Sequence, residues 1–380
     1  MQPFGEIPRP NWLEIDLDNL QSNIHYVKSL LPAGVKILLP VKADAYGHGA
    51  LAVSSAAIDA GVDFLGVAHL FEGISLHENG IKARILILGP CTESDFPFLL
   101  KNNLTPSISN YETAKKLSTL NSKQKIHIQI DTGMHRFGIK NDNFDEVKKI
   151  CELPNLEVEG MYSHLATADM PQHPAMEKQL ARFDKLVKEL ENAGMRPPIC
   201  HIANSPATLL FADKTHYDMV RPGISLYGYD PVGKFPSEFP LKPVLKLRST
   251  VRALREVEAG EGVSYGHFFI AKKNMLVATV AIGYGDGYLR GEPNKGVIFI
   301  RGKACPILGR VCMDACMVDA SEVPDIEIGD IAECINGEFS EQISVEAFAA
   351  EHKTISYEIT TRMAGRLCRV YKYGGKKETP

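Results

Sequence analysis

The segment VKADAYGHGA, residues 41–50, carries a lysine in a setting that suits covalent chemistry. Lys42 follows an apolar run, so we expect it at the carboxyl end of a buried strand, with Tyr46 four residues further on. Gly47 and Gly49 allow the backbone to come close to a bound molecule. Desolvation lowers the pKa of a lysine, and a neutral amine attacks carbonyl groups to form a Schiff base. Taken alone, Lys42 is equally compatible with a lysine whose stem lies along the rim of the core and whose ammonium reaches water.

Four further segments place polar or charged side chains directly after apolar runs. Singly, each has an ordinary explanation as a buried histidine, a surface ion pair or a helix N-cap. Together they are harder to attribute to chance, because the carboxyl ends of parallel barrel strands all face one mouth. The segments are IQIDTGMHRFG with Arg136, GMYSHLATAD with His164, CHIANSPA with Asn204 and Ser205, and MVRPGISLYG with Arg221, Gly223 and Ile224.

The same residues predict a cofactor. Ser205 and the backbone N–H groups of Gly223 and Ile224 suit a phosphate group after the seventh and eighth strands of a barrel. A phosphate site beside a Schiff-base lysine describes pyridoxal phosphate, which stabilises a carbanion at the α-carbon of an amino acid. Arg221 would then face the pyridine nitrogen. Because an arginine keeps its proton, it would leave that nitrogen unprotonated and favour α-proton exchange over transamination.

Alternating apolar runs and helical stretches must position these side chains. A segment at 12–31 begins as a strand and continues as a helix, for which Asp18 is the expected N-cap. Continuous apolar strands between helices are typical of parallel βα units, and eight of them close a barrel. A doubly wound sheet is the alternative, but no G-x-G-x-x-G motif opens a first helix. The runs expected as barrel strands are 36–41, 63–68, 83–89, 105–110, 125–131, 156–164, 198–205 and 217–228.

The pattern changes after the proline-bearing stretch at 230–243. The segments that follow are β-rich with glycine turns, and no long helix is expected before 341–352. We therefore predict an α/β protein of two domains: a (β/α)8 TIM-like barrel over residues 1–240, and a mainly antiparallel β domain over residues 241–380.

A series of segments, in order and across nearly the whole chain, resembles the motifs of the alanine racemase family. They include WLEIDLDNLQSN, VKADAYGHGA, DTGMHRFG, SHLATAD, ANSPA, VRPGISLYG, VSYG, IGYGDGYLR, GRVCMDACMVD and ISYEI. The resemblance implies a pyridoxal-phosphate-dependent isomerase that interconverts L- and D-alanine, forms a homodimer with shared active sites, and supplies D-alanine for cell-wall precursors.

The resemblance also implies roles for single residues. Lys42 would carry the cofactor and act as the base on one face of the substrate, and Tyr265 of the partner subunit would be the base on the opposite face. His164 would link Arg221 to that tyrosine. Arg136 and Met313 of the partner subunit would approach the substrate. The cofactor would be bound by Lys42, Tyr46, His164, Asn204, Ser205, Arg221, Gly223, Ile224 and Tyr357, and the substrate entrance would be lined by Asp169, His201, Tyr284, Arg290 and Arg310.

One position departs from the family pattern. Many members carry a carbamylated lysine two residues before the aspartate of DTGM, where this chain has Gln129. A glutamine can hydrogen-bond Arg136 but brings no negative charge. Either an anion from solution takes that place, or Arg136 is held differently.

The composition excludes several other classes of partner. A net charge of −4 and a pI near 6.3 give no electrostatic footprint for nucleic acid. No apolar run is long enough for a membrane span and no secretory signal is present, so we expect a cytoplasmic protein. The eight cysteines are scattered, mostly in apolar contexts, which suits reduced thiols. Cys305, Cys312 and Cys316 lack the turn of a zinc knuckle, so no metal is expected.

Other functions stay open. A racemase of serine or of broader range would share the same site. A barrel-type decarboxylase of basic amino acids would need an acidic group at the ring nitrogen and a glycine-rich phosphate loop, where this chain has Arg221 and RPGISLYG. A non-enzymatic cofactor carrier would need only the barrel, and the second domain with Tyr265 argues against it.

Overall fold

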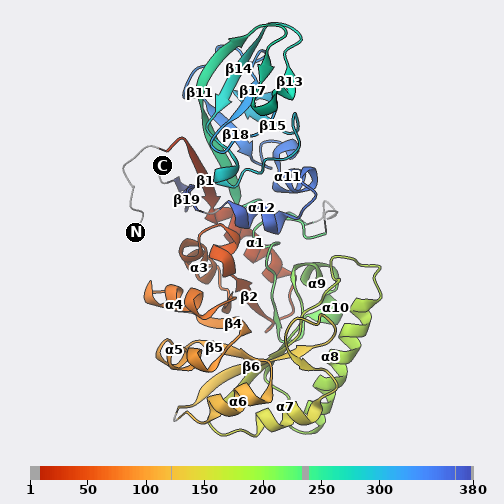
Figure 1. The fold of residues 1–380 in the computed structure, drawn as a ribbon. Coiled ribbons are helices and arrows are strands. Elements are labelled where there is room, and N and C mark those ends of the chain that lie inside the picture. Colours follow the sequence, from red (N-terminus) through yellow and green to blue (C-terminus); the bar gives the residue numbers. More distant parts are fainter. Residues whose placement is uncertain (1–8, 121, 233–238, 364, 378–380) are drawn as a thin grey trace.

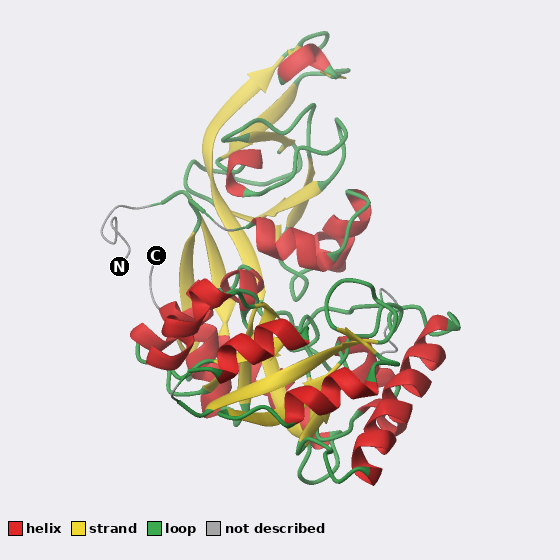
Figure 2. Ribbon diagram, turned by 60° about the horizontal axis from the view of Figure 1, so that its bottom comes forward, coloured by secondary structure: helices red, strands yellow, loops and turns green. Residues whose placement is uncertain are grey.

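The structure is a computed structural model that describes residues 9–120, 122–232, 239–363 and 365–377. It consists of a barrel with helices around it and a second domain made mainly of strands, one above the other in Figure 1. The helices lie outside the barrel strands in Figure 2, whereas the upper domain has few helices. In the described ranges, no helix combines the length and apolar character needed to cross a membrane.

Eight parallel strands form the barrel sheet, in the order β10-β2-β3-β4-β5-β6-β8-β9. Each overlaps one of the eight predicted runs, so the predicted (β/α)8 architecture is confirmed. Their bounds are β2 (Lys36–Pro40), β3 (Phe64–Val67), β4 (Arg84–Pro90), β5 (Thr105–Ile108), β6 (Gln124–Asp131), β8 (Leu156–Tyr162), β9 (Ile199–His201) and β10 (Met219–Val220), with a short β7 (Ile139–Lys140) beside β6.

The two ends of this sheet approach each other and nearly close the barrel. The Asp218 amide donates to the Cys200 carbonyl over 3.0 Å. The Arg221 amide donates to the Ala203 carbonyl over 2.9 Å. Apolar side chains that point inward from five strands fill the interior of the barrel. They are Leu38, Phe64, Leu86, Ile199 and Met219.

Helices follow the strands as the predicted alternation requires. Between them and the strands lies the larger hydrophobic core. The helices are α1 (Leu17–Ser29), α2 (Lys42–Tyr46), α3 (Ala50–Asp59), α4 (Leu70–Glu78), α5 (Phe96–Lys101) after a 3-10 turn at Glu93–Asp95, α6 (Tyr111–Ser118), α7 (Phe144–Cys151), α8 (Ala175–Asn192), α9 (Ser205–Leu210) and α10 (Ala212–Thr215).

The second sheet is mainly antiparallel, as predicted, and runs in the order β16-β15-β18-β11-β1-β19-β20, with β14 beside β11 and β17 beside β14. Its strands are β1 (Asn11–Asp16), β11 (Leu245–Val257), β14 (Met275–Val280), β15 (Val297–Ile300), β16 (Lys303–Pro306), β17 (Cys316–Asp319), β18 (Ile331–Ile335), β19 (Cys368–Tyr373) and β20 (Lys376–Lys377). A separate hairpin is formed by β12 (Gly262–Val263) and β13 (Phe269–Ile270). The longer helices are α11 (Val345–Glu351) and α12 (Ser356–Arg362), with 3-10 turns at Tyr265–His267, Tyr284–Asp286 and Glu341–Ile343.

The first strand of the chain belongs to this second sheet, where β1 pairs antiparallel with β11 and parallel with β19. The division of the chain at residue 240 stays a prediction, and β1 crosses it. The predicted N-cap of α1 is corrected: Asp16, not Asp18, accepts a hydrogen bond from the Asn19 amide, over 3.0 Å. Asp16 caps the helix because β1 ends there and the backbone of that residue is still extended.

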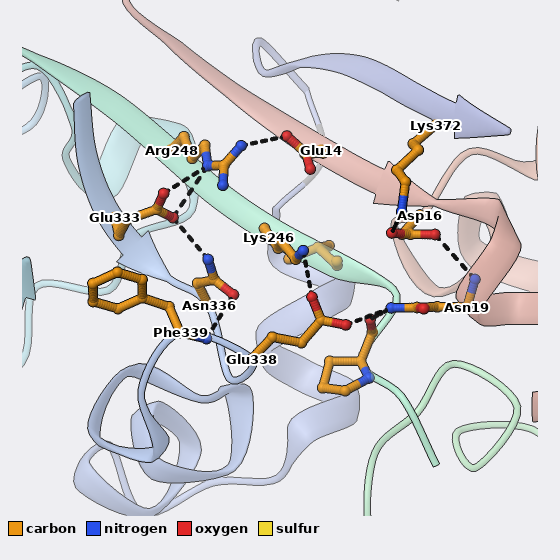
Figure 3. Close-up of polar contacts among 12 residues, drawn as sticks. Glu14, Asp16, Asn19, Lys246, Arg248, Glu333, Asn336, Glu338, Phe339 and Lys372 are labelled. Atoms are coloured by element: carbon orange, nitrogen blue, oxygen red, sulfur yellow. Dashed lines mark hydrogen bonds and ion pairs between the residues drawn. The ribbon is translucent and has the colours of Figure 1, made fainter. Parts of the chain in front are cut away.

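Ion pairs and hydrogen bonds join the two domains around β1 and β11 (Figure 3). Asn19 of α1 donates to the Glu338 carboxylate and to the Pro243 carbonyl. These partly buried contacts tie α1 to the segments that precede β11 and follow β18. The ion pairs drawn there are Lys246 with Glu338, Lys372 with Asp16, and Arg248 with Glu14 and Glu333.

Candidate active site

Lys42 lies directly beyond β2, at the start of a turn with unusual backbone geometry. The four residues that follow it, Ala43 to Tyr46, all have φ between 51° and 53°. A left-handed turn of L-residues costs about 1–2 kcal/mol per residue, so surrounding contacts must hold it. The Ala43 amide donates to the Glu72 carboxylate over 2.7 Å, and the His48 ring contacts the carbonyls of Ala45 and Tyr46 at 3.0 Å each.

The surroundings of Lys42 favour its neutral form. Burial comes first, and with the nearby guanidinium groups of Arg136 and Arg221 it lowers the pKa of the Lys42 amine; the Glu72 carboxylate opposes this only partly. Within the described ranges no hydrogen bond or ion pair occupies Lys42. A lowered pKa and the lack of a polar partner among the described residues both suit an amine that forms a Schiff base.

Ser205 lies against the loop after β10, where the sequence predicts a phosphate site, the Ser205 cradle. The Ser205 hydroxyl accepts hydrogen bonds from the Gly223 amide at 2.8 Å and from the Ser225 amide at 3.3 Å. Tyr46 closes one side, since a Cβ at Gly223 would lie 3.0 Å from its hydroxyl oxygen. The Ser225 hydroxyl is buried and has no hydrogen-bond partner among the described residues. A glycine at 223 and the unpaired Ser225 hydroxyl fit an anionic group.

Tyr357 lies beside this cradle, and Asn204 precedes Ser205 in the chain. The Tyr357 ring of α12 packs edge-on against Tyr46, with 5.8 Å between ring centroids, and its hydroxyl lies beside Ser205. Burial, and then the Asp169 carboxylate nearby, raises the pKa of Tyr357, which keeps the phenol protonated and able to donate. Asn204 acts differently from a cofactor ligand: it caps α9 by accepting from the Ala207 amide and donates to the Leu165 carbonyl.

Arg221 is buried and held from several sides. It donates to the Ser163 carbonyl over 2.7 Å and approaches the Nδ1 atom of His164 at 3.3 Å and that of His201 at 2.8 Å. Its guanidinium also lies over the Tyr162 ring, 5.2 Å from the centroid. Burial lowers the pKa of Arg221 to about 10, so it stays protonated at neutral pH. The predicted neighbourhood of Arg221 and His164 is therefore present.

His201 is not where the sequence led us to expect it. Its predicted place was the substrate entrance, but its side chain is fully buried inside the barrel and stacks on Tyr162, with 4.9 Å between ring centroids. The reason is that His201 is the last residue of β9 and points inward toward Arg221. His201 therefore contacts Arg221 from inside the barrel.

Gln129 and Arg136 do not form the hydrogen bond that their spacing allowed. Gln129 is 5% exposed, and its Oε1 atom has no hydrogen-bond partner among the described residues. Arg136 is exposed and lies beside the Phe137 ring, 5.9 Å from its centroid. His135, next to it, has φ 57° and pairs with Asp131.

Apart from Tyr357, the predicted residues of the second domain lie on its surface. Tyr265 is 69% exposed and Met313 is 53% exposed. Tyr265 follows β12, in the hairpin whose β13 lies in the upper domain of Figure 1, away from the barrel. Tyr284 and Arg290 line a surface cavity of about 480 Å³. Arg310 lies over the Phe268 ring, 4.2 Å from its centroid. This chain alone therefore does not bring Tyr265 to Lys42.

Three supporting residues were missed by the sequence analysis: Glu72, His48 and Tyr162. A glutamate three residues into α4 is a capping-box signal, and Glu72 does accept from the His69 amide. Its further bond to Ala43 depends on the tertiary fold and leaves no local signal. In the parts of the chain that are described, no group of three or more His, Cys, Asp or Glu side chains is placed to hold a metal ion.

Comparisons with known proteins agree with this geometry. Residues 15–231 match the family model "Alanine racemase, N-terminal domain" and residues 244–371 match "Alanine racemase, C-terminal domain". The alanine racemase of Halothermothrix orenii is 39% identical over 371 residues, which cover 96% of this chain and 98% of that protein. The solved alanine racemase of Clostridium difficile 630 has a TM-score of 0.90 at 34% identity, covering 98% of both chains. That of Bartonella henselae, solved with covalently bound pyridoxal phosphate, has a TM-score of 0.83 at 31% identity, covering 96% of this chain and all of that one.

Proposed function

The chain belongs to the alanine racemase family and interconverts L- and D-alanine, and we propose that it does so with pyridoxal 5′-phosphate bound in the barrel mouth. One observation carries the proposal: the Lys42 amine, whose pKa is lowered by burial, lies at the same strand ends as the Ser205 cradle and the buried Arg221 guanidinium. The Bartonella henselae relative holds that cofactor covalently.

The residues present fit this cofactor. Ser205, the amides of Gly223 and Ile224, and the phenols of Tyr46 and Tyr357 would hold its phosphate. Lys42 would bind its aldehyde carbon, and Arg221 would face the ring nitrogen. When bound, the cofactor withdraws electrons from the α-carbon of the amino acid and makes its proton acidic.

Two bases on opposite faces of the α-carbon would then move this proton. Lys42 is one, because burial lowers the pKa of its amine and so favours the form that can accept a proton. Tyr265 of the partner subunit is the other, and the exposure of Tyr265 away from its own barrel supports a homodimer with shared sites. Arg221 donates to Nδ1 of His164, so the free Nε2–H of this neutral ring is available to Tyr265 of the partner subunit and would stabilise its phenolate.

Substrate choice follows from the side chains around this position. Arg136 would bind the substrate carboxylate, with Met313 of the partner subunit beside it, and Tyr357 would limit the space for the side chain. A small pocket favours alanine over lysine or arginine, whereas serine differs only by a hydroxyl. Asp169, Tyr284, Arg290 and Arg310 would line the route to the site. The decarboxylase alternative is not favoured by the relatives. The cytoplasmic location and the supply of D-alanine for cell-wall precursors stay predictions.

The test of the proposal is circular dichroism of the purified protein with L-alanine, alongside an absorbance scan for the bound cofactor. We expect the optical activity to fall to zero while the amino acid stays intact, and to do so only in protein that shows cofactor absorbance. Racemisation by protein that holds no pyridoxal phosphate would overturn the proposed cofactor. Turnover of lysine as fast as alanine would refute the small-pocket argument.

A further inference from the structure

A chain of buried polar side chains leads from Arg221 through the barrel to its opposite end. Arg221 Nη1 contacts His201 Nδ1 at 2.8 Å, and His201 Nε2 contacts His127 Nδ1 at 2.9 Å. His127 Nε2 then faces the Glu159 Oε2 atom at 3.6 Å. Glu159 pairs with Lys125 at 2.8 Å and with Arg84. The two histidine side chains are fully buried and that of Glu159 is 5% exposed.

The positions of the protons along this series of side chains follow from the chemistry of Arg221, its first member. A guanidinium can only donate, so His201 Nδ1 must accept and the His201 proton must reside on Nε2. That proton is donated to His127 Nδ1, which leaves the His127 proton on Nε2, directed at the Glu159 carboxylate. Burial lowers the pKa of both histidines, which keeps each ring neutral with one proton.

Glu159, at the far end of this series of side chains, is suited to accept a hydrogen bond. Burial alone would raise the pKa of Glu159, but contacts from His127, Lys125 and Arg84 outweigh burial and lower it to about 2. His127 Nε2 and Glu159 Oε2 have no hydrogen-bond partner among the described residues, so each is the nearest complement of the other. Gly160 makes room for the ring, since a Cβ there would lie 2.3 Å from His127 Cε1.

We propose that His127 and Glu159 are positioning residues for catalysis: His127, oriented by Glu159, accepts the Nε2 proton of His201, and this bond acts with the Arg221 contact to fix the His201 tautomer whose Nδ1 atom holds the Arg221 guanidinium against the cofactor ring. The inference rests on the proposed function, because Arg221 matters to turnover only if it faces the cofactor. None of the three groups behind Arg221 touches substrate. Their effect is to keep one donor of Arg221 occupied, so that the guanidinium cannot turn away.

The test compares two variants of nearly equal shape. His127→Asn keeps an acceptor oxygen at the position of Nδ1, whereas His127→Leu removes it, and both lose the contact with Glu159. In the holoenzyme we expect His127→Asn to keep kcat for alanine within about 3-fold of the wild type. We expect His127→Leu to lower kcat about 10-fold or more with little change in KM, because a buried His201 N–H is left unpaired and only the Arg221 contact then opposes the other tautomer.

A second readout does not depend on activity. In cofactor-free protein labelled with ¹⁵N-histidine, NMR reports which ring nitrogen of His201 carries the proton, with the signal assigned by its loss in His201→Gln. We expect Nε2–H in the wild type and in His127→Asn, and loss of that single tautomer in His127→Leu. A His201 protonated at Nδ1 in the wild type would overturn the inference, and so would equal kcat values for the two variants.

Glu159→Gln covers the case in which His127→Leu does not fold. Its amide oxygen would be taken by Lys125 and Arg84, so its N–H₂ group would face His127 Nε2 and reverse the proton order. We expect kcat to fall about 10-fold in this variant too, with the His201 proton moved from Nε2. An unchanged tautomer would refute the role of Glu159. If the wild type fails to racemise alanine, the proposed function fails, while the NMR result still decides the proton order.

Discussion

Gly47, at the end of the left-handed turn, is the point where the catalytic segment meets the second domain. It has φ +85°, and a Cβ there would lie 2.0 Å from the Thr360 carbonyl oxygen and 2.9 Å from the Thr360 carbonyl carbon, both in α12. Because backbone atoms cannot rotate away, Gly47→Ala must push α12 from α2. Gly34 is a matched control, since it has φ +89° and nothing within 4 Å of the added methyl.

The size of the effect follows from this comparison. Both substitutions place an L-residue in the left-handed region, which costs about 1–2 kcal/mol of unfolding free energy. Gly47→Ala adds an overlap with packed backbone, and overpacking of this kind costs about 1–3 kcal/mol more. We therefore expect a loss of about 1–2 kcal/mol for Gly34→Ala and about 2–5 kcal/mol for Gly47→Ala. Displacement of α12 also moves Tyr357, so cofactor affinity should fall only in Gly47→Ala.

The assay is urea unfolding of the cofactor-free proteins, followed by absorbance titration with pyridoxal phosphate. The reasoning would be refuted if the two variants had unfolding free energies within about 0.5 kcal/mol of each other. The surface methyl of Gly34→Ala and the interdomain methyl of Gly47→Ala would then cost the same. Equal cofactor affinities would show that the contact between α2 and α12 does not shape the phosphate cradle.

Two other predictions concern the cofactor and the response to acid. Ser205→Ala should weaken pyridoxal phosphate binding about 10-fold in the same absorbance titration, because it removes the hydroxyl at the centre of the cradle; an unchanged affinity would contradict the assignment. Burial lowers the pKa of His48 to about 4, so unfolded protein binds more protons between pH 6.5 and 4, and the free energy of unfolding should fall by roughly 3 kcal/mol over that range from this group alone. Unfolding followed against pH should be less steep in His48→Gln, and equal slopes would rule out His48 as the source.

The sequence was informative wherever burial left a clear pattern of apolar residues. The eight barrel strands are buried on both faces, so each reads as a continuous apolar run, and the strand ends then placed Lys42, Ser205 and Arg221 at one mouth. The β-rich segments and glycine turns of the second domain predicted its mainly antiparallel sheet equally well. These features depend on local composition, which can be taken directly from a sequence.

Features that depend on distant contacts could not be read in this way. The residues from Ala43 to Tyr46 have no propensity for a left-handed turn, and a contact from elsewhere in the chain, the Glu72 carboxylate on the Ala43 amide, helps to hold it. His201 was misplaced because a motif gives its position after a strand but not whether its side chain points inward. The choice of Asp16 over Asp18 as the N-cap is set by where β1 stops pairing.

The central claim is that two different bases serve the two faces of alanine, and the most direct measurement is solvent exchange in Tyr265→Phe. The variant, with cofactor bound, is incubated in D₂O with L-alanine and with D-alanine separately, and loss of the α-proton signal is followed by ¹H NMR. We expect exchange to continue for the enantiomer whose α-proton faces Lys42 and to be abolished for the other. Equal residual exchange for both enantiomers would contradict the two-base account.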